Sequence, residues 1–586
     1  MRRLITALVA ALLIVSGLGS VARAADPPPP PGPTAPVEKT EADAGCVYGS
    51  QAVSSFTPQT YAKTYTSAML WNIENKPTSE CNLTIGWFPF SRSTISSNYT
   101  FVVDTESNGP DANNGPCPAG AADPDCKPGA WQTMWTQAAT YKCTTSTDLN
   151  CVVSVEAIDE SGTVVAGKYV RGFPERPKVP GSKGNGAWVA DGGATPLWEF
   201  DLPSGKVNVL TNGVLETNWS NQGGQWSTRA QPSYRLALFG VNIVADSKLP
   251  KPAVEWSETM YNGKVVKKFS SGYTPDPKCL SFDEGECAVE VPLPDGVRWR
   301  VTMQMPEGAM LFLNARLRQP TAYTEPISGG FKFVIEAAPA DVLSVAQVIP
   351  KAVLSRAVVE KALADSRRGD GWIFARSNAD NFSEGAGNEA LVWVNALMPY
   401  LGDRSSWVSR IWSLSTVNNA TNFGQQCQDK ARNSFLGVVS TNATAYTAEP
   451  PKFNQATSSL EYEVSSPHFL PDGKTVATGR YALNLNADFM TCLLGVSKVP
   501  DQAKIELTYG TGEVNAATIN VKQTKNWLTL IAENFTYSSP KISIAFPKAA
   551  APTQPSKAVA KSVTCAKGKT TKKFAGTKCP SGWKKK

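Results

Sequence analysis

The chain has 586 residues, with 57 Lys or Arg, 50 Asp or Glu and a single His. Residues 1–24 hold three Arg and no acid, and residues 561–586 hold nine Lys and no acid, which leaves a body of 45 basic and 50 acidic residues. A body with net charge −5 beside a segment of +9 argues against nucleic acid as the main partner, because binding phosphates needs a basic face on the body itself.

The N-terminus has the pattern of a secretory signal. Two arginines precede an apolar run from Leu4 to Leu18, and Ala22-Arg23-Ala24 supplies the small residues of a cleavage site. We expect a signal peptide over 1–24, followed by a proline-rich arm over 25–45 in an extended polyproline conformation. Since no later segment has the ~18 consecutive apolar residues of a spanning helix, no transmembrane segment is expected.

Most of the body predicts β-strands. Stretches of four to eight residues alternate in polarity or run apolar between clusters of Gly, Pro, Asn and Asp. Short strands at this spacing favour β-sandwiches, so we expect a mainly β fold with two or three sandwich-like domains and disordered termini. The domains are placed at 46–180, 181–345 and 417–547. Clear examples of such strands are Leu83–Phe88, Tyr99–Val103, Val152–Ile158, Val207–Leu210, Val297–Met303, Phe331–Glu336, Lys474–Leu485 and Ile505–Tyr509.

One region between these domains has a different pattern. Apolar residues recur at helical spacing in Lys351–Asp365, and Asn388–Leu401 and Arg404–Trp412 also look helical. We therefore expect a short helical region over 346–416.

Twelve cysteines in an exported chain form an even set, consistent with disulfides in an oxidising compartment. Spacing suggests local pairs and two longer closures. Zinc sites want closely spaced Cys or His ligands, which this chain lacks, so no metal and no cofactor are expected. The suggested pairs are Cys46–Cys81, Cys117–Cys126, Cys143–Cys151, Cys279–Cys287, Cys427–Cys492 and Cys565–Cys579.

The C-terminus is the most informative segment. After an Ala/Pro-rich linker over 548–560, residues 561–586 form a lysine-rich tail in which two cysteines can close a loop. The tail resembles a short C-terminal module found on many exported proteins of actinobacteria, with Trp583 where tyrosine is more usual. The resemblance covers the tail alone; it implies an exported, envelope-associated protein and no activity. The residues that match are Cys565, Lys567, Gly568, Lys569, Lys572, Lys573, Lys578, Cys579, Pro580, Gly582, Trp583, Lys584 and Lys585.

A polycationic tail attracts anionic surfaces, and salt screens that attraction. We expect anionic cell-envelope polymers as partners and place the protein as secreted, in the cell envelope or at the cell surface. A solvated basic end that only aids solubility is the alternative. The expected envelope-binding residues are Lys567, Lys569, Lys572, Lys573, Lys578, Trp583, Lys584, Lys585 and Lys586.

Candidate chemistry in the body is sparse, and no catalytic residue is predicted. The only histidine, His468, lies in a turn and favours a surface or packed role. Asp104–Gly115 resembles half of a calcium loop without its final carboxylate, and Asp283–Glu286 is a weaker acidic tip. Acids near aromatic residues leave two-carboxylate glycoside hydrolysis open, although ordinary surface acids explain each case. These acids are Glu199, Asp201, Glu216, Glu255, Glu258, Glu384 and Glu389.

Sixteen tryptophans allow for glycan binding by stacking, while core packing is the other role for each of them. The closely spaced pairs are Trp131/Trp135, Trp188/Trp198 and Trp219/Trp226.

The leading interpretation is an exported structural, adhesive or ligand-binding protein, more consistent with a non-enzyme. The alternative is a secreted carbohydrate-active protein, either a glycoside hydrolase or a glycan-binding module.

Overall fold

The structure is a computed structural model. It describes residues 82–87, 99–104, 115–116, 131–175, 178, 182–184, 187–222, 225–249, 255–261, 264–270, 279–307, 312–350, 355, 357–358, 361, 386–417, 426–428, 435–447, 449–508, 514–537, 541–546 and 562–586. These residues are mainly β, as the sequence predicts. Hydrogen bonding joins 21 strands into one continuous system that folds over two hydrophobic cores.

Two layers of strands enclose the first core. The layers keep apolar residues at alternate positions, which is the pattern of a sheet with one buried face. One layer consists of β5 (Tyr141–Lys142), β6 (Cys151–Ile158), β7 (Val164–Ala166), β18 (Arg298–Pro306) and parts of β19 (Phe312–Ile327) and β20 (Gly330–Pro350). The other consists of β8 (Lys168–Gly172), β11 (Pro196–Leu202), β12 (Gly205–Gln222), β13 (Gln225–Ala245) and β21 (Trp407–Thr416).

Contacts across this core come from aromatic and sulfur-containing side chains. The rings of Phe200 and Trp299 meet edge to face at 5.0 Å between centroids. The Tyr234 hydroxyl donates to the Met303 sulfur at 3.3 Å, and the Trp412 indole N–H donates to the carbonyl of Ala337 at 3.1 Å. Residues from the ranges 46–180 and 181–345 thus line a single core.

β19 belongs to both layers because it turns at Gln319. That residue has φ of +49°, and the pairing register shifts between Arg318 and Thr321. The first part of β19 pairs with β21 and with β22 (Gly437–Thr441), and the second part pairs with β20. A bulge of this kind lets one strand form a corner of a sandwich.

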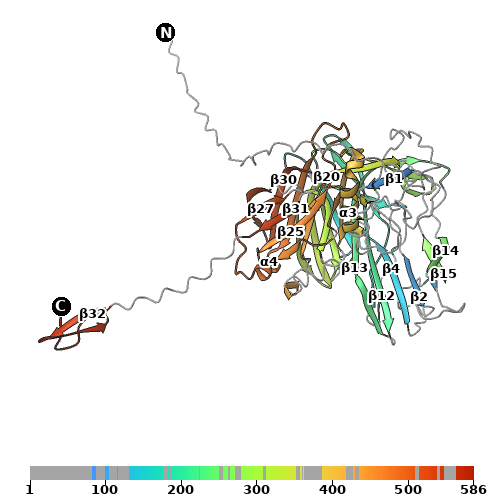
Figure 1. Cartoon of the computed structure of the whole chain (residues 1–586). Helices are drawn as coiled ribbons and strands as arrows, with labels where there is room; N and C mark the ends of the chain where they lie inside the picture. The colour runs from blue at the N-terminus through green and yellow to red at the C-terminus, as the bar shows by residue number, and fades with distance from the viewer. Residues whose placement is uncertain are drawn as a thin grey trace, which may run out of the picture.

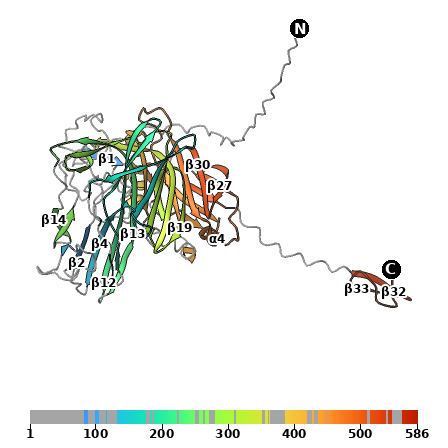
Figure 2. The ribbon, with the colours of Figure 1, turned by 180° about the vertical axis from the view of Figure 1, so that it is seen from behind.

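A second sandwich continues from β22. One of its sheets contains β22, β26 (Thr478–Asn486), β30 (Trp527–Thr536) and β29 (Lys522–Thr524). The other contains β23 (Ala445–Tyr446), β24 (Lys452–Asn454), β25 (Ser459–Ser465), β31 (Lys541–Ala545), β27 (Gln502–Thr508) and β28 (Val514–Asn520). In β22, Val438 faces the first core and its neighbour Val439 faces the second, because successive residues of a strand point to opposite faces. Figures 1 and 2 show the two sandwiches side by side.

Helices are few among the described residues. The helix expected at Asn388–Leu401 is confirmed as α3 (Ala386–Leu397) followed by the 3₁₀ turn η5 (Met398–Leu401). The helix expected at Arg404–Trp412 is wrong: this segment enters β21, which pairs with β13, β19 and β20. Pairing with strands that are distant in sequence makes this segment a strand, since its own pattern is compatible with both a helix and a strand. Most of Lys351–Asp365 lies outside the described residues.

The helix α4 (Ala487–Leu494), which follows β26, is not predicted from the sequence. The side chain of Asn486 caps it by accepting from the N–H of Phe489 at 3.0 Å, and Gly495 with φ of +65° ends it. Neither α3 nor α4 has the length that a membrane-spanning helix needs, within the part of the chain that the structure describes.

The remaining strands extend these sheets or form small separate ones. β1 (Asn82–Trp87) pairs with β20, and β17 (Glu286–Val291) joins β16 (Cys279–Asp283) to β13. β4 (Trp131–Ala139) joins β2 (Tyr99–Asp104) to β12, and β3 (Gly115–Pro116) pairs with β2. Small sheets are formed by β9 (Ser182–Gly184) with β10 (Ala187–Val189), and by β14 (Glu255–Tyr261) with β15 (Lys264–Ser270).

Four of the six expected disulfides are confirmed. They are Cys143–Cys151, Cys279–Cys287, Cys427–Cys492 and Cys565–Cys579. The residues of the other two expected pairs, Cys46, Cys81, Cys117 and Cys126, lie outside the described residues. Four disulfides fit a protein that folds in an oxidising compartment.

Candidate functional site

The C-terminal module, residues 562–586, forms a three-stranded antiparallel sheet. Its strands are β32 (Ser562–Lys567), β33 (Thr570–Ala575) and β34 (Lys584–Lys585), in the order β33-β32-β34. Gly568, with φ of +62°, lies in the tight turn between the first two strands. The N–H of Lys586 donates to the carbonyl of Thr564 at 3.0 Å, which extends the pairing to the last residue.

The disulfide Cys565–Cys579 holds this small sheet together. Cys565 is fully buried and Val563 nearly so, and the Trp583 ring packs against Phe574 at 5.2 Å between centroids. Trp583 is partly buried, and its backbone N–H donates to the carbonyl of Pro580 at 3.0 Å in the turn before β34. Because so few side chains are buried here, the covalent bond and the aromatic pair supply most of the order.

The lysines of the C-terminal module lie on both faces of its sheet. In the register, Lys572 and Lys585 flank Cys565, which places them on one face. Lys573 lies opposite Thr564 and Lys584 opposite Ala566, which places both on the other face. All eight expected envelope-binding lysines are exposed, and the segment contains no acid. The module therefore presents positive charge in every direction instead of one shaped pocket.

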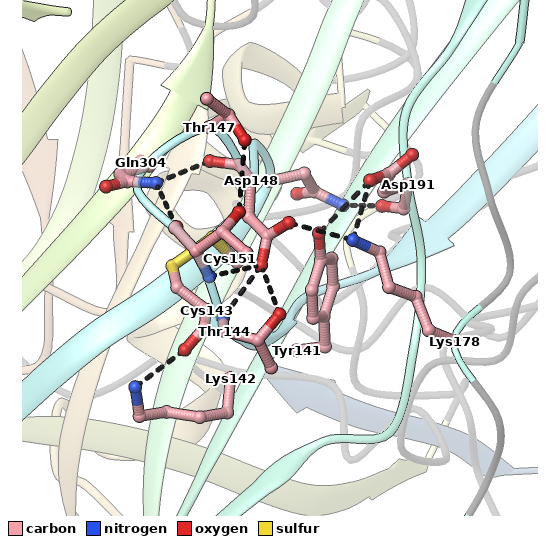
Figure 3. Close-up of polar contacts among 12 residues, drawn as sticks. Tyr141, Lys142, Cys143, Thr144, Thr147, Asp148, Cys151, Lys178, Asp191 and Gln304 are labelled. Carbon is pink, nitrogen blue, oxygen red and sulfur yellow. Dashed lines mark hydrogen bonds and ion pairs between the residues drawn. A yellow bond between two sulfur atoms is a disulfide. The ribbon is translucent and has the colours of Figure 1, made fainter.

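The body contains a dense polar cluster that the sequence did not predict, shown in Figure 3. The Lys178 ammonium lies 2.9 Å from Asp148 Oδ1 and 3.0 Å from Asp191 Oδ2, and 4.7 Å from the centre of the Tyr141 ring. The Tyr141 hydroxyl donates to Asp191 at 3.2 Å. The N–H groups of Thr144 and Thr145 donate to Asp148 Oδ2 at 2.7 and 3.0 Å.

The protonation states of this cluster indicate a structural role. Burial raises the pKa of Asp148, but hydrogen bonds from Thr144 and Lys178 outweigh it and hold that pKa well below its usual range. Burial lowers the pKa of Lys178, but its bonds to Tyr141, Asp148 and Asp191 bring it above the ordinary value. Burial raises the pKa of Tyr141. The pKa shifts of Asp148, Lys178 and Tyr141 all point away from neutrality, which favours a cluster that anchors the Cys143–Cys151 loop over one that transfers protons.

Replacing Asp148 with asparagine should destabilise the first sandwich at neutral pH. Asp148 is 7% exposed and accepts charge-assisted bonds, so we expect a loss of about 2 kcal/mol. Because the folded pKa is depressed, this stabilisation is complete above the unfolded pKa of about 3.9 and is lost as the pH falls toward the folded pKa. Thermal unfolding of the wild type and of Asp148→Asn from pH 7 to pH 2 should therefore show a difference in melting temperature that becomes smaller in acid. Asp201→Asn, with a side chain 83% exposed, is the control and should match the wild type. A difference in melting temperature that stays constant with pH would contradict the stabilising role given to the Asp148 carboxylate.

Three of the acids singled out in the sequence have ion-pair partners among the described residues. Glu199 and Asp201 both lie near Lys206, at 3.0 and 3.9 Å, and Glu216 pairs with Arg235. Glu255 and Glu258 lie on β14 and Glu389 on α3, with side chains that are not described, while Glu384 lies outside the described residues. Each of the three ion-paired carboxylates has a lysine or arginine beside it, and the Asp201 side chain is 83% exposed, which favours the role of ordinary surface acids.

Other sequence candidates have structural roles. His468 is packed, 4% exposed, with Nδ1 2.9 Å from the carbonyl of Tyr537. Arg171 forms ion pairs with Asp283 and Glu286, which gives two of the three acids of that tip a cationic partner. Asp104 ends β2, and the rest of the half calcium loop up to Gly115 lies outside the described residues. No group of metal-binding side chains occurs among the residues that the structure places.

The tryptophans divide between the core and the sheets. Trp198 is 2% exposed in the first core, which confirms core packing for that member of its pair. Trp188 lies on β10, Trp131 and Trp135 on β4, Trp219 on β12 and Trp226 on β13. Four of these six positions therefore fall on adjacent strands, which the sequence alone does not reveal.

Comparison of this chain with protein-family models, curated proteins and solved structures finds no match.

Proposed function

We propose that this protein is an exported, envelope-associated structural, adhesive or ligand-binding protein that its C-terminal module holds on anionic envelope polymers. The observation that carries the proposal is the module itself, where eight exposed lysines surround a disulfide-held sheet with no acid. The signal-like N-terminus and the four disulfides support export.

The charge distribution favours a flexible polyanion over a single small ligand. Each lysine near an anionic surface contributes about 1 kcal/mol of attraction at moderate ionic strength. Lysines on both faces of the sheet can each contact an anionic group without one shared geometry, since an ammonium is a point charge. The mildly acidic body adds no attraction of its own, so retention depends on the C-terminal module.

Binding to isolated cell walls across a salt series tests the proposal. We expect the full-length protein to sediment with walls at low salt and to be released near 1 M NaCl, where the screening length falls to about 3 Å. A form that ends at Ala560 should stay in the supernatant throughout. Neutralising Lys572, Lys573, Lys584 and Lys585 to glutamine should cost ~1 kcal/mol for each lysine close to the polymer.

The matched control neutralises four exposed lysines of the body, Lys168, Lys248, Lys498 and Lys504. It removes the same charge and should retain wall binding. Equal retention of the truncated form, or equal loss in the control, would defeat the proposal.

A further inference from the structure

The aromatic residues of the C-terminal module lie on one face of its sheet. Val563 and Cys565 alternate on β32 and are 5% and 0% exposed, so they mark the face that holds the small core. In the register, Phe574 lies opposite Val563, and the Trp583 ring packs against the Phe574 ring. Since the module contains no other aromatic residue, this face is called the aromatic face below.

The aromatic pair is only partly covered. Phe574 and Trp583 are half-buried, whereas Val563 and Cys565 are buried. The planes of the two rings meet at 71°, and in such an edge-to-face arrangement each ring covers at most one face of the other. The pair therefore leaves apolar surface that a ligand can cover.

Three lysines border this pair. Lys572 and Lys585 both lie opposite Cys565, on the two neighbouring strands, and so belong to the aromatic face. Lys567 follows Cys565 by two residues on β32, and its ammonium lies 3.8 Å from the place that a Cβ would take at Gly582. All three lysines are exposed. The aromatic face thus combines ring surface with three positive charges.

The opposite face of the sheet carries comparable charge but no ring. Lys573 lies on it opposite Thr564, and Lys584 lies on it opposite Ala566. Small residues therefore separate the lysines on this face. Because the charge of the two faces is comparable, only the rings distinguish them for an anionic ligand.

We propose that the aromatic face of the C-terminal module binds an acidic polysaccharide. One sugar ring stacks on Trp583, and the anionic groups of neighbouring sugars contact Lys572 and Lys585. The flat apolar face of a sugar suits an aromatic ring, and an ammonium needs no fixed geometry to contact a carboxylate or a phosphate. A polyanion without rings would satisfy the lysines but leave the aromatic surface in water. This inference rests on the proposed function and deepens it by naming the class of polymer that the module prefers.

Calorimetric titration of the full-length protein with two polyanions at the same salt concentration tests the inference. Polygalacturonate carries a carboxylate on each sugar ring, whereas poly-L-glutamate carries a carboxylate on each residue and has no sugar ring. We expect tighter binding to polygalacturonate. Trp583→Ala should weaken that binding about tenfold, and binding to poly-L-glutamate by less than about twofold, because only the sugar polymer loses a stacked ring. Trp583→Tyr keeps a ring and should weaken binding to polygalacturonate less than Trp583→Ala.

Two double variants with the same change in charge separate the two faces. Lys572→Gln with Lys585→Gln removes two charges from the aromatic face, and Lys573→Gln with Lys584→Gln removes two from the opposite face. Both keep the rings and the disulfide. On polygalacturonate the first double variant should lose severalfold more affinity than the second, because the stacked sugar places its anionic neighbours at the aromatic face. On poly-L-glutamate the two should lose similar affinity.

Controls separate a binding role from a folding role. Amide hydrogen exchange of β32 and β33 checks that the module is folded in each variant. Tyr169→Ala removes a 41% exposed aromatic residue of the body and should bind both polymers like the wild type. If Trp583→Ala unfolds the module, the two double variants decide the question, since they keep both rings.

Three results would overturn the inference: equal binding to the two polymers, equal loss in the two double variants on polygalacturonate, or the same loss in Tyr169→Ala as in Trp583→Ala. Any of these, together with salt-sensitive wall binding that needs the C-terminal module, would leave the proposed function standing. Failure of the proposed function is seen separately, as wall retention of the form that ends at Ala560.

Discussion

Replacing Arg316 with alanine is expected to lower the free energy of unfolding by about 3–5 kcal/mol, among the largest single effects in this protein. Arg316 lies on β19 at the junction of the two sandwiches and is fully buried. Its guanidinium lies 4.3 Å from the centre of the Tyr446 ring. It donates to the carbonyls of Thr441 and Thr444 at 3.3 and 3.2 Å, and also to that of Ala443.

The size of this effect follows from what the substitution leaves behind. Alanine removes the donors, so up to three buried carbonyls lose a partner, at about 1–3 kcal/mol for each that finds no other. It also removes a cation–π contact in a desolvated site, which contributes roughly 2 kcal/mol. Relief from burying a cation offsets part of the loss, so the total is smaller than the sum of these contributions.

Urea unfolding followed by intrinsic fluorescence and circular dichroism measures the change. The control is Arg318→Ala on the same strand, where the side chain is exposed and the expected change is below about 1 kcal/mol. Arg316→Lys keeps the charge but cannot reach several carbonyls at once, so it should fall between the two. Equal stability of Arg316→Ala and Arg318→Ala would show that the buried guanidinium does not stabilise the segment 441–444, whose carbonyls it contacts.

Replacing Cys579 with serine should unfold the C-terminal module while leaving the body folded. The disulfide to Cys565 closes a loop of 15 residues, which in the loop-entropy model stabilises the module by about 3 kcal/mol. Val563 and the Phe574–Trp583 pair offer too little buried surface to replace it. Amide hydrogen exchange of β32 and β33 should become fast, and trypsin should cleave after the lysines of the module.

Wall binding by Cys579→Ser shows whether the charge of the C-terminal module or its folded structure is needed for binding. Because Cys579→Ser keeps every lysine, it should still bind walls at low salt, with a similar dependence on salt concentration. The lysine-to-glutamine variant makes the matched comparison, since it keeps the disulfide and should lose binding while its amides stay protected. Wall binding that disappears with the disulfide would instead mean that the folded sheet recognises a specific structure.

Local patterns in the sequence determined the β class, the disulfides between near neighbours and the lysine-rich module. Alternation with period two is a property of single strands, so segments such as Val152–Ile158 and Phe331–Glu336 could be identified alone. Cysteines eight residues apart, as in Cys143–Cys151, need only one turn to meet. The charge of residues 561–586 depends on composition and on no partner elsewhere in the chain.

Only the tertiary structure decided the features that depend on distant partners. The segment Trp407–Thr416 is a strand because β13, β19 and β20 pair with it, and β22 is buried on both faces because two cores meet there. Arg316 and the Asp148–Lys178 pair give no sequence signal, since their partners lie up to 128 and 30 residues away. Strand register, which brings Phe101 opposite Trp135, is likewise set by pairing across the sheet and not by either segment alone.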